Sequence, residues 1–487
     1  MAHDIKNILE KYPDFKANIG IEIHVQLKTE SKIFCSCPNN FGDKPNQNIC
    51  PICAGYPGVL PVLNKKVVDF AIMAGLATNS KITQKTWFDR KHYMYPDLPK
   101  NYQITQDQAP ICTNGYITIE LLDNKQKNIN LVRIHMEEDA GKNIHGTNNE
   151  SYVDLNRAGT PLLEIVSFPD IENSNEAKLY LNNLKSIVQY LNISDANMEE
   201  GSFRGDVNIS VRRSDEKKLG TKVELKNVNS FKFIVNAIEY EIERQINAIK
   251  KGEKIIQETR GWDSKENKSF LMRSKEEAQD YKYFKEPDLP ILLIDDIWIN
   301  NIKNSLPELP TQKFNRFKSE YNLSSYEAEI LTGEVELANF FEQTCKITKQ
   351  PQKTANWLLR NVLAYLNENK LILKNSKITV NNFAELILAI ESGKINTSVA
   401  QEVFAQMANT GKSPNIIIKE NNLEQIEDTQ ALEDIILNII KNHPEEVKSY
   451  LSGKDRLFGF FVGLAMKETQ GKANPKILQE LLKKHLK

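Results

Sequence analysis

Apolar and polar residues alternate with a period of two in the first half of the chain. In residues 19–27 (IGIEIHVQL) every odd position is isoleucine, valine or leucine, and Glu22 and His24 stand between them. Successive side chains of a strand point to opposite faces, so this pattern predicts a half-buried strand. Residues 207–212 and 223–226 repeat it, with turn-rich stretches between them. The region predicts a sheet rich in antiparallel pairs.

Patterns of helical period interrupt and then replace this alternation. Residues 176–191 and 231–250 carry apolar side chains three or four positions apart, which predicts two helices within the sheet region. A proline-marked stretch at residues 286–310 ends that region. Beyond it, amphipathic segments predict further helices, for example at residues 325–332, 354–367 and 382–392.

These patterns predict an α+β protein of three parts. We expect an antiparallel-rich N-terminal domain over residues 1–295, an all-α helical domain over residues 296–415, and a small all-α tail domain over residues 416–487. A chain of 487 residues is about three times a typical domain of ~150, which agrees with this division.

Charge and composition restrict the class of protein. The chain has 63 Lys and Arg against 64 Asp and Glu, a net charge of −1, so no overall basic field would attract nucleic acid. The apolar fraction of 40% and charged fraction of 26% exclude collagen-like and coiled-coil classes. The tail differs, because residues 441–487 hold ten Lys or Arg and five acidic residues. It is predicted to be a basic module.

The location is predicted to be cytoplasmic, without a membrane span. The N-terminal residues lack the apolar core of a signal peptide. The longest nearly uncharged apolar stretch, residues 457–466, is about half the ~20 residues that cross a bilayer. The chain has six cysteines, too few for a disulfide scaffold, which suits a reducing compartment.

Acidic residues next to apolar ones indicate a metal site. Glu22 and His24 lie two apart, so they share one face of their strand. Glu138 belongs to the acid-rich segment HMEEDAGK, Glu164 interrupts an apolar run, and Glu224 alternates with apolar neighbours. Oxygen ligands with at most one histidine favour Mg²⁺ over zinc. We therefore hypothesise an acid-lined concavity that holds Mg²⁺.

A plainer interpretation of the same residues stays open. Glu22 and His24 could lie on a solvated sheet face, Glu138 could begin a helix, and Glu164 could pair with a cation such as Arg157. The chain has no Walker or Rossmann phosphate loop, so cations such as Lys91 or Arg157 would have to meet phosphate charge. Residues 89–102 interleave cations with aromatics, which suits either base stacking or a loop pinned by its tyrosines.

The cysteines are spaced as in a structural zinc site. Cys35, Cys37, Cys50 and Cys53 form two close pairs separated by twelve residues. Four thiolates complete a tetrahedral zinc site and leave no open position for water, so the predicted zinc is structural. The alternative is four unrelated buried thiols. Cys112 and Cys345 are isolated and are expected in the core.

A series of longer strings resembles one known family. The strings in order are IGIEIHVQLKT, YPGVLPVLNK after the cysteines, FDRKHYMYPDLPKNYQI, HMEEDAGK, LNRAGTPLLEIVS, EEGSFRGDVNISVR, TKVELKNVNSF, QETR, MRSKEEAQDY and GFFVGLAMKETQGKANP. They resemble the GatB family, which comprises the B subunits of the tRNA-dependent aspartyl/glutamyl amidotransferases. The resemblance runs from about residue 19 to the C-terminus, and it implies that the N-terminal domain is a catalytic cradle and that the tail domain binds tRNA.

The resemblance implies a function and partners. The family amidates misacylated Glu-tRNA(Gln) or Asp-tRNA(Asn), using ATP and ammonia from glutamine, and GatB is expected to phosphorylate the side-chain carboxylate and amidate it. Ammonia is expected from the family's amidase (glutaminase) subunit, with its small third subunit in the same heterotrimer. The chain itself shows no Gly/Ser-rich amidase signature.

The resemblance also implies site residues. Mg²⁺ would be held by the catalytic residues Glu22, His24, Glu138, Glu164 and Glu224. The pocket for ATP would be lined by Lys91, Tyr93, Arg157, Asp206 and Asn227. The tRNA backbone would be contacted by Lys454, Arg456, Lys467 and Lys472.

The chain departs from the family pattern at positions outside the expected ligands. Gly205 stands where Cys is expected, Gly261 is unusual after QETR, and Gln279, Lys282 and Lys285 replace His, Arg and Pro. Two other functions stay open at this point. One is a tRNA-binding scaffold without chemistry of its own, and the other is a zinc hydrolase, which the four cysteines disfavour.

Overall fold

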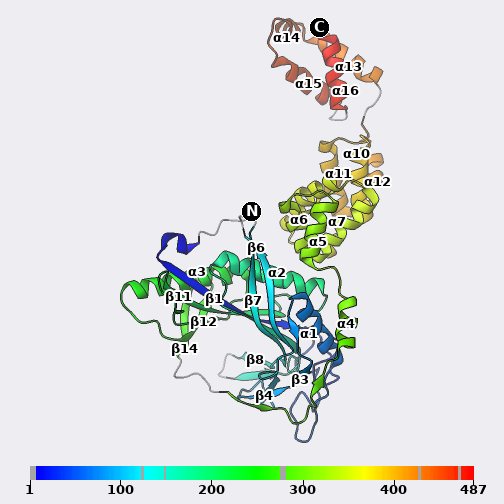
Figure 1. Ribbon diagram of the computed structural model, residues 1–487. Helices are drawn as coiled ribbons and strands as arrows, with labels where there is room; N and C mark the ends of the chain where they lie inside the picture. The colour runs from blue at the N-terminus through cyan, green and yellow to red at the C-terminus, as the bar shows by residue number, and fades with distance from the viewer. Residues whose placement is uncertain are drawn as a thin grey trace. The chain divides into compact units, whose positions relative to one another are not determined.

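The chain forms two compact units, residues 1–312 and residues 313–487. This computed structural model describes residues 7–121, 125–146, 150–274, 281–425, 429–469 and 473–486. The first unit combines a large sheet with helices and the second is built from helices, so the predicted α+β fold is confirmed (Figure 1).

A nine-stranded sheet with the order β14-β13-β12-β11-β1-β10-β7-β6-β2 is the centre of the first unit. All neighbouring strands pair antiparallel except β12 and β13, which are parallel. The antiparallel-rich sheet is thus as predicted. Its strands are β1 (Phe15–Gln26), β2 (Lys81–Ile82), β6 (Cys112–Glu120), β7 (Gln126–Glu138), β10 (Pro161–Ser167), β11 (Phe203–Arg213), β12 (Val223–Lys226), β13 (Glu258–Asp263) and β14 (Lys268–Ser274).

Helices cover one face of this sheet. They are α1 (Lys65–Ala77), α2 (Ser174–Tyr190) and α3 (Phe231–Lys250), and their apolar sides form one core with the odd-numbered residues of β1. Ile19 and Ile23 are completely buried in that core. The helices begin where side chains cap free backbone N–H groups, as Asn173 does for α2 and Ser230 for α3. The apolar face predicted for the strand therefore packs against the apolar faces predicted for the helices.

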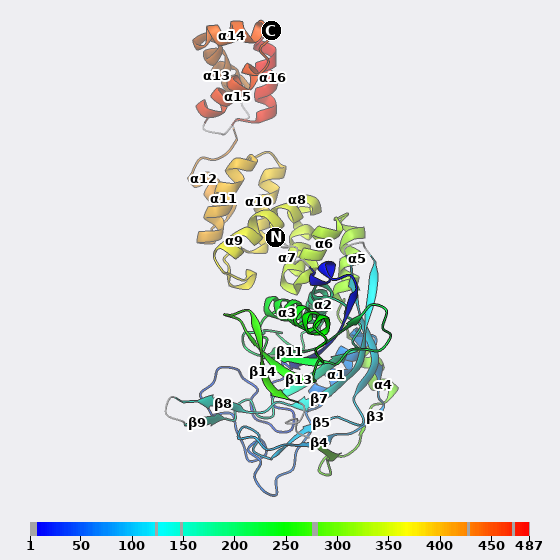
Figure 2. The same cartoon turned by 90° about the vertical axis from the view of Figure 1, so that its left-hand side faces the viewer.

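Small sheets lie on the other side, away from α2 and α3, in both views (Figure 2). They comprise β15 (Lys282–Lys285), β4 (Asp89–His92) and β5 (Tyr102–Thr105); β16 (Leu292–Leu293) and β3 (Lys85–Thr86); and β8 (Lys142–His145) and β9 (Ser151–Asp154). The backbone N–H of Ile104 in β5 donates to Glu138 at the end of β7. On the even-numbered, polar face of β1, the side chains of Glu22 and His24 are only partly exposed, at 29% and 19%.

Helix α4 (Asp296–Asn304) follows the proline-marked stretch and packs on the first unit. Its Trp298 Nε1 donates to Asp69 of α1 at 2.8 Å, and its apolar residues join the core of the sheet. The compact unit accordingly runs past residue 295. The predicted division into three domains at residues 295 and 415 stays a prediction.

The second unit is a succession of helices. Its bounds are α5 (Pro310–Glu320), α6 (Ser325–Gly333), α7 (Val335–Thr348), α8 (Pro351–Trp357), α9 (Leu363–Glu368), α10 (Val380–Glu391), α11 (Thr397–Thr410), α12 (Pro414–Glu420), α13 (Thr429–Asn442), α14 (Pro444–Leu451), α15 (Leu457–Glu468) and α16 (Pro475–His485). The predicted helix at residues 354–367 is continuous but contains a π-helical turn, Leu358–Val362. In the tail, Phe461, Leu478 and Leu482 are buried in a separate small core.

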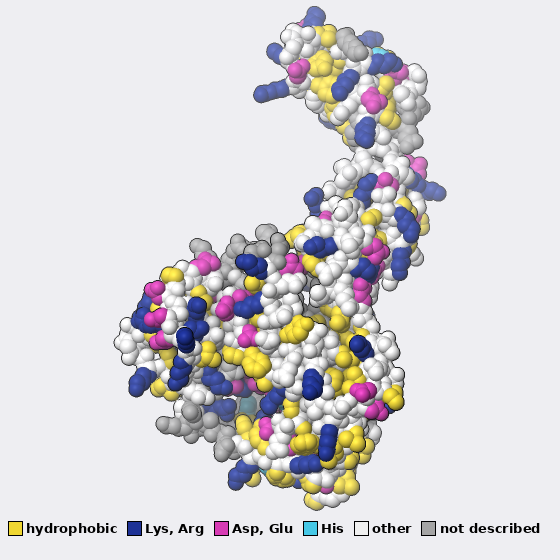
Figure 3. Space-filling model, in the orientation of Figure 1, with side chains coloured by type: hydrophobic (Ala, Val, Ile, Leu, Met, Phe, Trp, Pro, Cys, Tyr) yellow, Lys and Arg dark blue, Asp and Glu magenta, His cyan; other side chains and the backbone are white. Residues whose placement is uncertain are grey.

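Positive and negative side chains are interspersed on the tail face visible in Figure 3.

Within the part of the chain that the structure describes, no helix combines the length and apolarity needed to cross a bilayer. The predicted cytoplasmic location stays a prediction.

Two of the departing glycines lie at close contacts between strands. A Cβ on Gly205 would come within 2.8 Å of Ile23 Cδ1, since Gly205 lies directly opposite Ile23 in the β1–β11 pair. Gly261 lies opposite Phe270, whose ring covers it, and a Cβ there would be 2.5 Å from the ring. The larger neighbouring side chains occupy the space that a side chain at these positions would need. Gln279 lies outside the described residues.

Candidate active site

Strand register gathers acidic and imidazole side chains on the polar face of the sheet. His24 in β1 lies opposite Glu164 in β10, and Glu164 lies opposite His135 in β7. On the other side of β1, Glu22 lies opposite Asp206 in β11. Directly opposed residues of neighbouring strands share a face. Residues separated by more than 100 positions in the sequence therefore meet in one row.

Carboxylates surround the imidazole of His24. Its Nε2 is 3.2 Å from Glu164 Oε2, 3.6 Å from Glu137 Oε1 and 3.8 Å from Glu22 Oε1. Glu137 and Glu164 are buried, and Glu22 is partly exposed. The structure thus brings Glu22 and Glu164, two of the predicted ligands, within 4 Å of the imidazole of His24, the third.

Glu137 is the residue that our sequence reasoning missed. His135 Nε2 lies 3.5 Å from both Glu137 Oε2 and Glu164 Oε2, and Thr105 Oγ1 donates to Glu137 at 3.1 Å. The alternation in β7 could have identified Glu137, because it is two positions from His135 and therefore lies on the same face of the strand. The acid-rich segment alone did not distinguish Glu137 from its neighbour.

Glu138 has a different environment. Lys100 Nζ lies 2.5 Å and 2.6 Å from its two carboxylate oxygens, and Ile104 N–H donates to it at 2.8 Å. Glu138 ends strand β7 and does not begin a helix. The structure therefore pairs this predicted metal ligand with a lysine and does not bring it beside His24.

Glu224 reaches the site from β12. It accepts a hydrogen bond from Thr259 Oγ1 at 2.8 Å and lies 3.3 Å from Lys226 Nζ, which also binds Asp206 at 2.8 Å. A cavity of about 190 Å³ is lined by both Glu22 and Glu224, with Arg273 and Lys222 among its other residues. Glu22 thus connects the His24 cluster to the pocket of Glu224.

The mutual proximity of these groups changes their ionisation. The pKa of His24 rises to about 9, because burial, which lowers it, is outweighed by Glu164, Glu137 and Glu22. Burial and then the charge of Glu164 raise the pKa of Glu22. The pKa of Glu164 lies well below its usual range, since His135 and His24 outweigh the effect of burial. The cluster therefore concentrates negative charge around the two imidazoles.

Lys91 and Tyr93 from the cation-aromatic segment approach the same cluster. Burial by itself lowers the pKa of Lys91, but the charges of Glu137 and Glu164 raise it above its ordinary value. Its Nζ lies 4.8 Å from the ring centre of Tyr281. Burial and then Glu137 raise the pKa of Tyr93. The charges of these acids therefore favour the protonated form of Lys91, and the place of both residues in the pocket for ATP stays a prediction.

Arg157 lies at the edge of the site and does not pair with Glu164. It donates to the carbonyl oxygens of Ala140 (2.9 Å) and Gly141 (2.6 Å), and its Nε is 3.6 Å from Asp139. Asp139 also accepts from Arg204 Nη2 at 2.7 Å. The alternative pairing of Glu164 with Arg157 is thus not formed.

Asn227 makes no contact with the His24 cluster in the described structure. Its Nδ2 lies 3.9 Å from Met272 Sδ, and its backbone has a positive φ of 61°. It follows β12 directly, close in sequence to Glu224 and Lys226. Its position at the pocket for ATP stays a prediction.

The acidic cluster fits a divalent cation. One ligand atom from each of Glu22, His24 and Glu164 lies within 4.8 Å of the others, and the same holds for His135, Glu137 and Glu164. The atom of His135 in this second group is Nε2, 3.5 Å from both Glu137 Oε2 and Glu164 Oε2. Buried carboxylates that face one another are costly without a cation between them. Their oxygen atoms are ligands that Mg²⁺ prefers.

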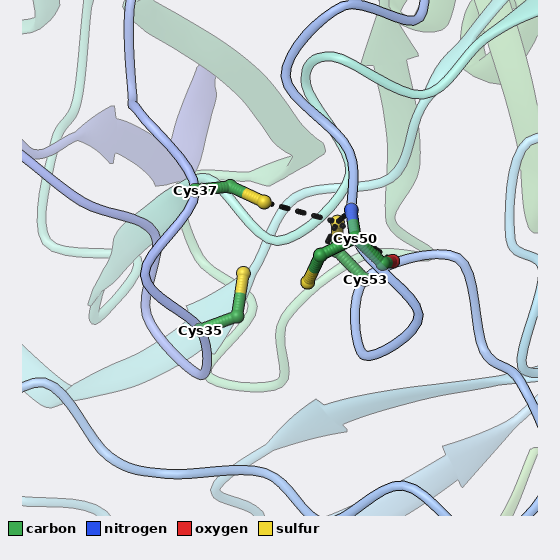
Figure 4. Close-up of side chains that lie close together, drawn as sticks. All are labelled: Cys35, Cys37, Cys50 and Cys53. Carbon is green, nitrogen blue, oxygen red and sulfur yellow. Dashed lines mark hydrogen bonds between the residues drawn. The ribbon is translucent and has the colours of Figure 1, made fainter.

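The four cysteines converge as their spacing predicts (Figure 4). Cys53 Sγ lies 3.9 Å from Cys37 Sγ and 3.9 Å from Cys50 Sγ, and all four sulfurs lie within 4.8 Å of one another. A tetrahedron with Zn–S bonds of about 2.3 Å has edges of about 3.8 Å. The cluster is therefore consistent with a structural zinc. Cys112 and Cys345 are buried core residues, as expected.

The predicted tRNA-binding residues lie in the tail. Lys454 and Arg456 are exposed in the turn between α14 and α15, beside an open groove of about 720 Å³. Lys467 is exposed in the last turn of α15. Lys472 lies outside the described residues. The first two share one turn and Lys467 is at the opposite end of the helix.

Two family models cover most of the chain. Residues 17–300 match the GatB/GatE catalytic domain, and residues 339–486 match the GatB domain. The first range contains the acidic cluster and the cysteines, and the second contains the tail. The chain belongs to the GatB family.

Full-length relatives agree with this assignment, and each is the B subunit of an aspartyl/glutamyl-tRNA(Asn/Gln) amidotransferase. The chain is 49% identical over 475 residues to the relative from Persephonella marina, covering 97% of this chain and 100% of the relative. It is 50% identical over 477 residues to that of Geotalea daltonii, covering 97% and 99%. It is 49% identical over 473 residues to that of Thermodesulfovibrio yellowstonii, covering 97% and 99%. This GatB chain therefore matches complete B subunits.

Proposed function

We propose that this chain carries the phosphoryl-transfer and amide-forming site for misacylated Glu-tRNA(Gln) and/or Asp-tRNA(Asn). As a member of the GatB family it is part of a ligase that forms Gln-tRNA or Asn-tRNA. The observation that supports a catalytic role is the convergence of Glu22, Glu137 and Glu164 on His24. A surface that only binds tRNA does not require buried carboxylates to face one another.

The carboxylates that would hold Mg²⁺ are Glu22, Glu137 and Glu164, with Glu224 contributing from the adjoining pocket. His24 would join them as a ligand in its neutral form, so binding of the ion would release the proton of the imidazolium. We propose Glu137 for the role that the sequence had assigned to Glu138, because Glu138 is paired with Lys100. A bound Mg²⁺ would neutralise phosphate charge during transfer from ATP to the side-chain carboxylate.

Protein cations complete the site. The charges of Glu137 and Glu164 raise the pKa of Lys91, so a protonated Lys91 would stabilise charge that develops on the transferred phosphoryl group. Arg157 and Arg204 are oriented by Asp139 at the rim, where an anionic ligand would enter. Lys226 bridges Asp206 and Glu224, and it would thereby hold Glu224 at the cavity that Glu22 also lines. Burial of the cluster limits water, which would otherwise hydrolyse the acyl phosphate before ammonia attacks.

The reaction also needs a source of ammonia and a surface that binds tRNA, and the cysteine loop would hold a second metal. We propose that ammonia comes from an amidase (glutaminase) partner, and that a small third protein completes a heterotrimer. We propose that zinc binds Cys35, Cys37, Cys50 and Cys53 and stabilises the loop without taking part in the chemistry. The exposed tail cations Lys454, Arg456 and Lys467, together with Lys472, would contact the tRNA backbone.

ATP hydrolysis by the reconstituted heterotrimer tests this function. We would compare wild type, Glu224→Ala and the exposed control Glu266→Gln, each with and without Glu-tRNA(Gln). Hydrolysis that depends on misacylated tRNA, survives in Glu266→Gln and is lost in Glu224→Ala is the expected result. Unchanged hydrolysis in Glu224→Ala, with tRNA binding also unchanged, would instead indicate a scaffold whose chemistry lies elsewhere.

A further inference from the structure

A fully buried lysine lies against the four-cysteine cluster. Lys32 has an exposed fraction of 0%, and its Nζ is 2.7 Å from the carbonyl oxygen of Asn48, 3.3 Å from that of Leu155 and 3.5 Å from Cys53 Sγ. An ammonium has three N–H donors, so these three acceptors satisfy its hydrogen bonds. They do not by themselves neutralise its charge.

The charge of Lys32 requires a negative neighbour. Two of its acceptors are neutral carbonyls, and no ion pair joins it to a carboxylate within the described ranges. Burying an ammonium without a countercharge costs several kcal/mol. Of its three acceptors, only Cys53 Sγ can be an anion, and the other three sulfurs lie within 4.8 Å of that atom.

The charge balance of a metal centre complements this lysine. Four thiolates around one divalent cation have a formal charge of −4 + 2 = −2. One adjacent ammonium reduces that charge to −1, and an N–H donor to sulfur stabilises a thiolate further. Four neutral thiols would leave the ammonium unmatched, and four thiolates without a metal would leave a large negative excess.

We infer that Lys32 is the counter-cation of the metal–thiolate centre formed by Cys35, Cys37, Cys50 and Cys53. It acts as a positioning residue: it holds the Cys53 thiolate and stabilises the bound metal, and it takes no part in amide formation. This inference rests on the zinc centre proposed above. It adds to that proposal a specific residue outside the cysteine motif.

The same lysine connects the cysteine loop to a segment near the active site. Lys32 donates to the carbonyl oxygen of Leu155. The cysteine loop makes a second contact with the same segment, because Asn48 N–H donates to Asn156 Oδ1 at 2.8 Å. Ile33 N–H donates to the carbonyl oxygen of Gly159, and a Cβ added at Gly159 would lie 3.4 Å from Lys32 Cδ. Loss of the metal is therefore expected to loosen residues 155–159, the segment that carries Arg157.

Zinc retention by full-length variants tests the inference. Lys32→Met removes the charge and the donors, Lys32→Gln removes the charge but keeps a donor, and Lys28→Met is the control, since Lys28 is an exposed lysine paired with Asp195. Zinc release to a chromogenic chelator should be at least ~10-fold faster in Lys32→Met than in wild type. Lys32→Gln should also release zinc faster, and Lys28→Met should match wild type.

Cobalt substitution supplies a readout that a merely looser loop would not give. The thiolate-to-Co²⁺ charge-transfer band should move to lower energy in Lys32→Met and Lys32→Gln, because a sulfur without a nearby cation gives up an electron more readily. An unchanged band together with an unchanged zinc-release rate would overturn the inference.

Amine labelling of the wild type avoids dependence on a variant that fails to fold. Lys32 should be protected from an N-hydroxysuccinimide ester in the zinc-loaded chain and labelled after zinc is removed, with Lys28 labelled in both states. Equal protection with and without zinc would contradict the role of countercharge. If the wild type binds no zinc at all, the zinc centre and the inference fall together, whereas zinc binding that Lys32→Met leaves unchanged overturns the inference alone.

Discussion

His24 and Glu164 lie directly opposite each other in neighbouring strands, with His24 Nε2 3.2 Å from Glu164 Oε2. The contact joins two features that are separate in the sequence: a polar residue in an alternating strand and an isolated charge in an apolar one. Each compensates the other, because the carboxylate stabilises the imidazolium and the imidazolium stabilises the buried carboxylate. This pair is the centre of the candidate active site.

The two neighbouring acids of β7 should respond differently to the same substitution. Glu137→Gln removes a carboxylate from the His24 cluster and is expected to lower the rate of tRNA-dependent ATP hydrolysis at least ~100-fold, with little loss of stability. Glu138→Gln breaks its buried pair with Lys100 and should lower the free energy of unfolding by about 3 kcal/mol. Steady-state hydrolysis and urea unfolding measure the two effects.

A second variant checks the structural role of Glu138. Because replacing both members of a buried ion pair leaves no unpaired charge, Glu138→Gln with Lys100→Met should be more stable than Glu138→Gln alone. Equal losses of activity and stability in Glu137→Gln and Glu138→Gln would contradict the distinction between them.

Loss of one cysteine of the cluster should remove zinc, whereas loss of a core cysteine should not. We expect Cys37→Ser to purify without zinc and to unfold at a lower temperature than wild type, because binding of the metal contributes to the stability of the loop. Cys345→Ser, a control in the helical unit, should retain one zinc per chain. Metal analysis by mass spectrometry and thermal unfolding test this, and a zinc-loaded Cys37→Ser would contradict it.

The close contact at Gly205 should make it intolerant of a side chain unless its neighbour becomes smaller. Gly205→Ala is expected to lower the free energy of unfolding by about 1–2 kcal/mol, because its Cβ would collide with Ile23 Cδ1. Ile23→Val removes that carbon, so Ile23→Val with Gly205→Ala should lose less than the sum of the single variants. Urea unfolding of all four forms measures the coupling, and strict additivity would show that the contact does not limit this position.

Acid should destabilise helix α7 of the helical unit, because Glu342 of that helix loses its charge. Burial raises the pKa of Glu342, but hydrogen bonds from Lys313 and Arg316 outweigh it and bring the pKa below its ordinary value. A carboxylate with a lowered pKa in the folded state adds stability above its unfolded pKa, and that contribution disappears as pH falls through the folded pKa. Amide exchange in α7 should therefore quicken more in wild type than in Glu342→Gln between about pH 5 and pH 3. Parallel acceleration in both proteins would refute this.

Most of the local structure was predictable from residue patterns. The strand predicted at residues 19–27 forms as β1 (Phe15–Gln26), and the strand at 223–226 and the helix at 231–250 form as predicted, because each pattern matches one face buried against a neighbour. The helix at residues 354–367 was predicted, but not its π turn, since an inserted residue barely changes the apolar periodicity.

The sequence by itself determined the faces of β1, the cysteine spacing and the strings shared with the GatB family. Only the tertiary structure decided that Glu137 and not Glu138 lies beside His24, and that Lys32 lies against Cys53. The physical reason is that alternation specifies which side chains share a face within one strand. The register between strands that are far apart in sequence, and the path of the loops between them, follow from packing of the whole sheet and its helices.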